Sequence, residues 1–81
     1  MEAKVIADLT SIVFDKDELL VFSSWLASFN RNNQGYQFED QSEERVLWNL
    51  ECALEKVMIE AFSDRYEILL AEAQAKIRDE E

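Results

Sequence analysis

Four residues in the middle of the chain recur at steps of four, three and four positions, and together they form what we call the acidic stripe: Glu44, Trp48, Glu51 and Glu55. On a helix this spacing aligns the side chains along one side. Large aromatic residues concentrate affinity in protein interfaces, and carboxylates attract basic groups. The stripe therefore predicts a surface that binds a basic partner. The alternative is that Trp48 extends the core and the glutamates are its solvated margin.

A second acidic group precedes the stripe and overlaps it: Glu39, Asp40, Glu43 and Glu44. Part of this charge is explained by helix capping, because Asp40 or Ser42 can accept hydrogen bonds from the free amides of a helix start. Arg45 is the one basic residue nearby. The remaining negative charge extends the predicted partner-binding surface.

Catalysis is disfavoured by the residue types present. The chain has no histidine, so serine or cysteine catalysis through a histidine base is excluded, and no other activating base is recognisable. The carboxylates of the acidic stripe would sit on a convex helical face, which has no pocket to desolvate an acid. No glycine-rich loop could hold a phosphate. We expect a binding protein and not an enzyme.

Metal and cofactor sites are not expected either. Asp15-Lys16-Asp17-Glu18 is superficially similar to a calcium loop, but the central glycine and the closing glutamate are missing, and helix capping explains the segment better. Cys52 is the one cysteine, so it can form neither an intrachain disulfide nor a cysteine-based zinc site. We expect Cys52 to pack as a small apolar side chain.

The charge of the whole chain limits the choice of partner. Eighteen acidic residues against eight basic ones give a net charge of -10, which repels nucleic acids and anionic lipids and attracts basic proteins. The same acidity also maintains solubility. The sequence shows neither a leader pattern nor a run of about 20 apolar residues that could span a membrane. We expect a single cytoplasmic domain of 81 residues.

The elements that would position these residues follow from apolar spacing. The β-branched and apolar run from Lys4 to Phe14 predicts a strand, with a short helix as the alternative. Asp15 and Glu18 have the spacing of a capping box, which predicts a helix from Asp15 to about Asn30. The chain's one glycine marks a loop over residues 30–35. The alternation at Tyr36 and Phe38 predicts a short strand that pairs with the first.

Two further helices are predicted in the second half of the chain. One begins at Asp40 or Ser42 and reaches Phe62, with this buried face: Leu47, Leu50, Leu54, Val57, Met58 and Ala61. Ser63 and Asp64 are expected to cap a last helix, whose apolar side is formed by Tyr66, Leu69, Leu70, Ala73 and Ile77. Its end, at residues 79–81, is expected to fray. The predicted fold class is α+β and mostly helical; an all-helical bundle is the alternative.

The chain resembles small bacterial immunity proteins of polymorphic toxin and contact-dependent growth inhibition systems. The resemblance lies in residues 44–56, continues through Phe62-Ser63-Asp64-Arg65-Tyr66 into residues 69–73, and includes Asp17-Glu18-Leu19 and Trp25-Leu26. It implies a stoichiometric inhibitor that binds and neutralises a toxin domain, often a nuclease. It transfers no functional residues, because immunity families differ widely in fold.

Two other functions fit the same charge and pattern. An acidic protein can imitate a nucleic acid and inhibit a restriction or CRISPR effector. Alternatively, the apolar helix faces could complete a homo-oligomeric subunit. The leading hypothesis from the sequence remains capture of a basic toxin by the acidic residues around Trp48.

Overall fold

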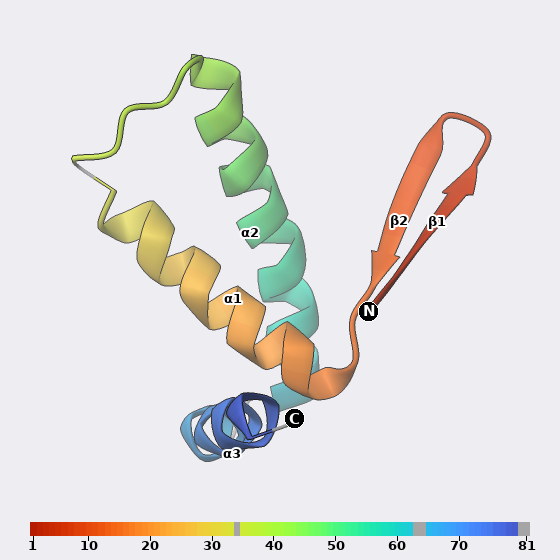
Figure 1. Ribbon diagram of the computed structural model, residues 1–81, viewed down its shortest axis with the longest axis vertical. Coiled ribbons are helices and arrows are strands. Elements are labelled where there is room, and N and C mark those ends of the chain that lie inside the picture. Colours follow the sequence, from red (N-terminus) through yellow and green to blue (C-terminus); the bar gives the residue numbers. More distant parts are fainter. Residues whose placement is uncertain (34, 63–64, 80–81) are drawn as a thin grey trace.

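The computed structural model describes residues 1–33, 35–62 and 65–79 of the chain. The described part contains two strands followed by three helices (Figure 1). The elements are β1 (Glu2–Ile6), β2 (Leu9–Val13), α1 (Lys16–Arg31), α2 (Gln41–Phe62) and α3 (Tyr66–Arg78). The predicted α+β, mostly helical fold is confirmed.

The N-terminal region is a β-hairpin and not a single strand. β1 and β2 pair antiparallel, with Glu2 opposite Val13 and Ile6 opposite Leu9. The chain reverses at Ala7 and Asp8, and Ala7 has a φ of 57°. This left-handed conformation costs an L-residue about 1–2 kcal/mol and usually selects glycine or asparagine. Because alanine is not a typical turn residue, the reversal was not predicted and the run from Lys4 to Phe14 was wrongly expected to be continuous.

The predicted short strand at Tyr36 and Phe38 is also wrong. Among the described residues the sheet has two strands, and the partner of β1 is β2 and not the segment at Tyr36 and Phe38. Both rings instead contact Phe29 of α1 edge-on, with centroids 5.4 and 6.3 Å from its ring. The two rings also contact each other at 4.8 Å. Ring packing against α1, which a local alternation cannot reveal, thus determines the conformation of this segment.

Helix α1 begins as the sequence predicts. Oδ1 of Asp15 accepts a hydrogen bond from the amide of Glu18 at 2.8 Å, and Oε1 of Glu18 accepts one from the amide of Asp15 at 3.1 Å. These two bonds form a capping box and satisfy two amides at the helix start. At the other end, the amide of Asn32 donates to carbonyls of the last turn. The predicted bounds are therefore correct to within one residue at each end.

Helices α2 and α3 also lie where apolar spacing places them. Three parts of the predictions fall outside the described residues: the burial of Ala61, the capping by Ser63 and Asp64, and the end at Glu80 and Glu81. In the described part, α3 follows Arg65, whose side chain makes no capping hydrogen bond.

The core of the described residues is small and centres on α1. Leu20 of α1 is fully buried against Met58 of α2 and Ala73 of α3. Half-buried apolar side chains surround this group: Leu19, Val21, Tyr66, Leu69 and Leu70. Lys76 of α3 also forms an ion pair with Asp17 at 3.2 Å. Helix α1 thus packs against both other helices.

Only part of the predicted apolar face of α2 is covered. Leu47, Leu50 and Leu54 are half-buried and Met58 is buried, whereas Val57 is 48% exposed. Because α2 packs mainly along α1, the contact covers a narrower strip than the apolar spacing suggested.

The hairpin projects away from the helices (Figure 1). All ten residues of β1 and β2 are exposed. At its base, the ring of Phe14 stacks on Phe22 of α1 with centroids 5.4 Å apart. The terminal ammonium of Met1 lies 3.2 Å from Oε1 of Glu18. The hairpin is therefore anchored at its base and free of helix cover along its length.

Candidate functional site

A row of aromatic rings runs along α1 and into the segment that leads to α2. Phe22, Trp25 and Phe29 lie at helical spacing on α1, and neighbouring rings are 6.2 and 5.2 Å apart. Phe14 extends the row at one end, and Tyr36 and Phe38 extend it at the other. Such offset contacts contribute about 0.5–1.5 kcal/mol per pair beyond area burial. The row contains six of the chain's nine aromatic residues.

The far end of this row forms one wall of an open groove of about 580 Å³ between α1 and the start of α2. We call it the aromatic groove, and these residues line it: Trp25, Phe29, Tyr36, Phe38, Ser42, Glu43, Val46 and Leu47. Trp25, Tyr36 and Val46 remain 55–62% exposed. A concave apolar surface with few polar groups is typical of a binding site.

Carboxylates lie at the edge of the aromatic groove because α2 starts there. Asp40 precedes the helix, and its Oδ2 accepts a hydrogen bond from the amide of Ser42 at 2.9 Å. Oε1 of Glu43 accepts one from the amide of Glu39 at 3.1 Å. Predicted capping by Asp40 is thus present, and Asp40 and Glu43 also remain exposed to solvent. Negative charges at a helix N-terminus are stabilised by its macrodipole.

The hydrogen bonds that Asp40 accepts at the start of α2 also affect the protonation of its carboxyl group. Hydrogen bonds from the hydroxyl and the amide of Ser42 hold the pKa of Asp40 below its ordinary value, since they favour the charged form. Asp40 therefore stays ionised at neutral pH beside the aromatic groove.

The acidic stripe does not form one continuous free surface. Glu51 is half-buried against α1, where its Oε1 accepts a hydrogen bond from Nδ2 of Asn30 at 2.7 Å. Nδ2 of Asn30 also donates to the carbonyl oxygen of Leu47 at 3.4 Å. Glu51 therefore stabilises the contact between α1 and α2, a role that the sequence did not predict.

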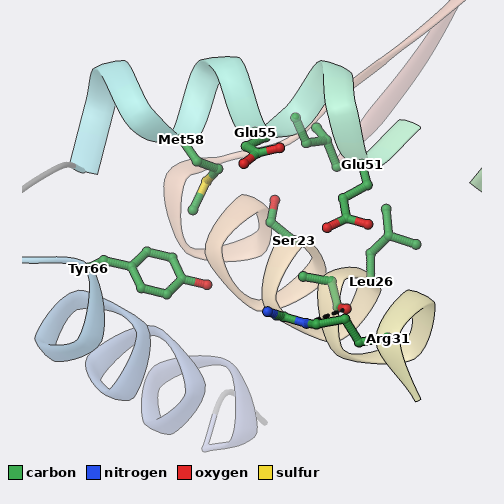
Figure 2. Close-up of a pocket in the computed structure, with 9 residues that line it drawn as sticks. Ser23, Leu26, Arg31, Glu51, Glu55, Met58 and Tyr66 are labelled. Carbon is green, nitrogen blue, oxygen red and sulfur yellow. Dashed lines mark hydrogen bonds between the residues drawn. The ribbon is translucent and has the colours of Figure 1, made fainter. Parts of the chain in front are cut away.

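Glu51 and Glu55 both line a cleft of about 230 Å³ between the helices (Figure 2). Ser23 points into it from α1, and Met58 and Tyr66 close one end (Figure 2). Oγ of Ser23 is buried without a hydrogen-bond partner, and an orphaned hydroxyl in such a space is usually satisfied by water. We interpret this cleft as a gap in the helix packing that polar and apolar side chains line together.

The other members of the stripe face outwards to different degrees. Trp48 is 50% exposed, and Glu44 is half-buried. Neither residue lines the aromatic groove or the cleft. Trp48 is therefore not a core residue of the described part, and its contact with a partner stays a prediction.

One chemical expectation, the packing of Cys52, can be compared with the structure. Cys52 is exposed on α2, so the expected packing role is wrong. Within the described ranges, no group of three or more Asp, Glu, Cys or His side chains is arranged to hold a metal ion.

The aromatic groove was not predicted, because the residues that line it belong to elements that are separate in the sequence. Trp25 and Phe29 lie within the predicted helix from Asp15 to about Asn30, and Tyr36 and Phe38 within the predicted short strand. The concentration of aromatic residues between positions 14 and 38 was the one available signal.

Comparisons with protein-family models, curated proteins and solved structures found no match to this chain. Of the helices in the described part of the chain, none has the length and apolar character needed to cross a membrane.

Proposed function

We propose that this protein binds a basic protein toxin through the aromatic groove and the acidic start of α2, and that binding neutralises the toxin. The observation that carries this proposal is the shared location of the two features. Ser42 and Glu43, from the first turn of α2, line the same groove as Trp25 and Phe29. The resemblance to immunity proteins supports the choice of a toxin as the partner.

The two parts of this surface would contribute differently to the complex. The half-exposed rings of Trp25 and Tyr36 offer the kind of pocket in which an apolar anchor of the partner becomes desolvated, and such anchors dominate binding energy. The carboxylates of Glu39, Asp40 and Glu43 would attract basic side chains, which raises the association rate more than the affinity. The net charge of -10 acts in the same direction at longer range.

Toxin neutralisation can be tested directly in a bacterial host. The product of the gene adjacent to this one is expressed with and without this protein, and growth is measured. We expect the neighbouring product to stop growth and this protein to restore it. The proposal is wrong if the neighbouring product is harmless, or if growth stays inhibited when both proteins are present.

The role of the groove can be tested with the same pair of purified proteins. Trp25→Ala should weaken binding by about 30-fold or more, mainly through faster dissociation. Glu39→Lys should slow association and reduce its dependence on salt, because the side chain is exposed. Glu72→Lys on α3 makes the same charge change away from the groove. Equal effects of Glu39→Lys and Glu72→Lys would show that net charge, and not this surface, attracts the partner.

A further inference from the structure

The hairpin carries a large share of the exposed apolar side chains of this protein. Five of them lie on its two short strands: Val5, Ile6, Leu9, Ile12 and Val13. Their exposed fractions lie between 47% and 75%. A two-stranded hairpin is marginally stable in water unless another strand or a helix covers it. This hairpin projects from the helices without such cover (Figure 1).

The strand register divides the hairpin into two unlike faces. Cross-strand partners point to the same side, so the pairs Ala3–Ile12 and Val5–Thr10 share one face. We call this the uncharged hairpin face, because none of its four side chains carries a charge. The opposite face carries the charged residues Glu2 and Lys4 together with Ser11 and three of the exposed apolar residues, Ile6, Leu9 and Val13. The uncharged hairpin face therefore has the composition of a surface that packs against protein.

The area of the molecule is also large for a single folded chain. Its accessible surface is 6725 Å², whereas a folded monomer of 9.5 kDa exposes about 5,000 Å². Its radius of gyration is 14.3 Å, against about 12 Å for a chain of this length. The excess area is roughly twice the ~800 Å² that each partner contributes to a standard protein interface. This excess belongs to the whole molecule, the projecting hairpin included, and shows that the chain exposes more surface than a compact monomer of its size.

The distribution of charge favours a second copy as the partner of the hairpin over a basic protein. Residues 1–14 carry two carboxylates and one lysine, whereas the other sixteen acidic residues follow from Asp15 onwards. Two copies that met through their helices would repel each other strongly. The hairpin is the region where they can meet with little repulsion. A basic partner would instead be attracted to the acidic helices.

We infer that the uncharged hairpin face is a homodimer interface, in which two hairpins pack face to face about a twofold axis. Val5 and Ile12 of one copy contact the hairpin of the other, as in any self-complementary interface. The interface leaves the aromatic groove open. The inference does not depend on the proposed function.

The adjacent residues Thr10 and Ser11 provide a matched test. Both are small, exposed hydroxyl residues on β2, but they point to opposite faces. Thr10→Glu would place a carboxylate of each copy in the interface, whereas Ser11→Glu would place it opposite Lys4. Like charges brought together in an interface are strongly unfavourable, so Thr10→Glu should weaken the dimer about a hundredfold or more. Ser11→Glu should leave the dimer intact.

Mass is measured by light scattering over a dilution series, with reductant present because exposed Cys52 could join two copies covalently. The expected results are a mass about twice the 9.5 kDa of one chain for the unmodified protein and Ser11→Glu, and a monomer for Thr10→Glu. Circular dichroism should show the same helix content in all three. The inference is overturned if the unmodified protein stays monomeric, if Thr10→Glu stays dimeric, or if Ser11→Glu dissociates as readily as Thr10→Glu.

Discussion

The helices and the hairpin of this protein are stabilised in different ways. At the centre of the helical part, Leu20 and Ala73 have no exposed surface, so the three helices bury side chains against one another. In the hairpin every residue of both strands is exposed, so pairing depends on the strands themselves and on whatever covers them. One short chain thus contains a part that is folded by its own core and a part that is available for contacts.

The largest effect should come from removing a side chain at the centre of the helical part. Leu20→Ala deletes a fully buried group that contacts α2 and α3 and should lower the free energy of unfolding by about 2–5 kcal/mol. Leu9→Ala in the hairpin removes the same atoms from a side chain that is 73% exposed and should cost less than about 0.5 kcal/mol. Urea denaturation followed by circular dichroism measures both. If the two variants lost similar amounts of free energy of unfolding, the division into a helical part with a core and an exposed hairpin would be wrong.

The second effect tests the junction between the two parts. Asp15→Ala removes the side-chain acceptor of the capping box and should cost about 1 kcal/mol of helix stability. Asp8→Ala, in the exposed hairpin turn, is the matched control and should leave thermal unfolding unchanged. If Asp15→Ala is also neutral, the capping box contributes nothing to stability.

A smaller effect of opposite sign is expected in the hairpin. Ala7→Gly relieves the left-handed conformation at φ 57° and, after the entropy cost of glycine, should stabilise the turn by about 0.5–1 kcal/mol. Slower amide hydrogen exchange in β1 and β2 would report this gain. The melting temperature of the helices should not change, because the hairpin does not cover them. A rise in that temperature would show that the two parts are coupled.

The smallest effect is a pH dependence at the start of α2. The pKa of Asp40 is lowered by its hydrogen bonds with Ser42, so between the folded and the unfolded pKa the unfolded chain binds more protons. The stabilisation is therefore complete above the unfolded pKa of about 3.9 and is lost as the pH falls through the folded value. A lower protection factor of the Ser42 amide at low pH, calculated after correction for the pH dependence of intrinsic amide exchange, measures this loss. Asp40→Asn keeps an acceptor but does not titrate, so it should abolish the pH dependence.

What could be predicted from the sequence differs between the same two regions. The helix bounds were predicted well because capping and apolar spacing are local; Asp15 and Glu18, for example, form their capping box within a single turn. The hairpin turn was missed because Ala7 adopts a conformation that alanine seldom adopts. The exposure of Cys52 and Val57 depends on which helices pack together, and no local pattern contains that information.

The candidate site was predicted in part. The acidic residues around Asp40 were identified and lie beside the aromatic groove. The groove itself is formed by rings that come from α1 and from the segment before α2, so it exists only once these parts have packed. For the same reason, the contact of Glu51 with Asn30 could not be derived from the spacing of the acidic stripe.

The central position of α1 has a consequence for cooperativity. This helix packs against both α2 and α3, and its residue Leu20 joins side chains from all three helices in one cluster. Unfolding of α1 therefore removes both of these helix interfaces together and breaks up the buried cluster that the described residues form. The three helices should melt in a single all-or-none transition, with equal calorimetric and van't Hoff enthalpies.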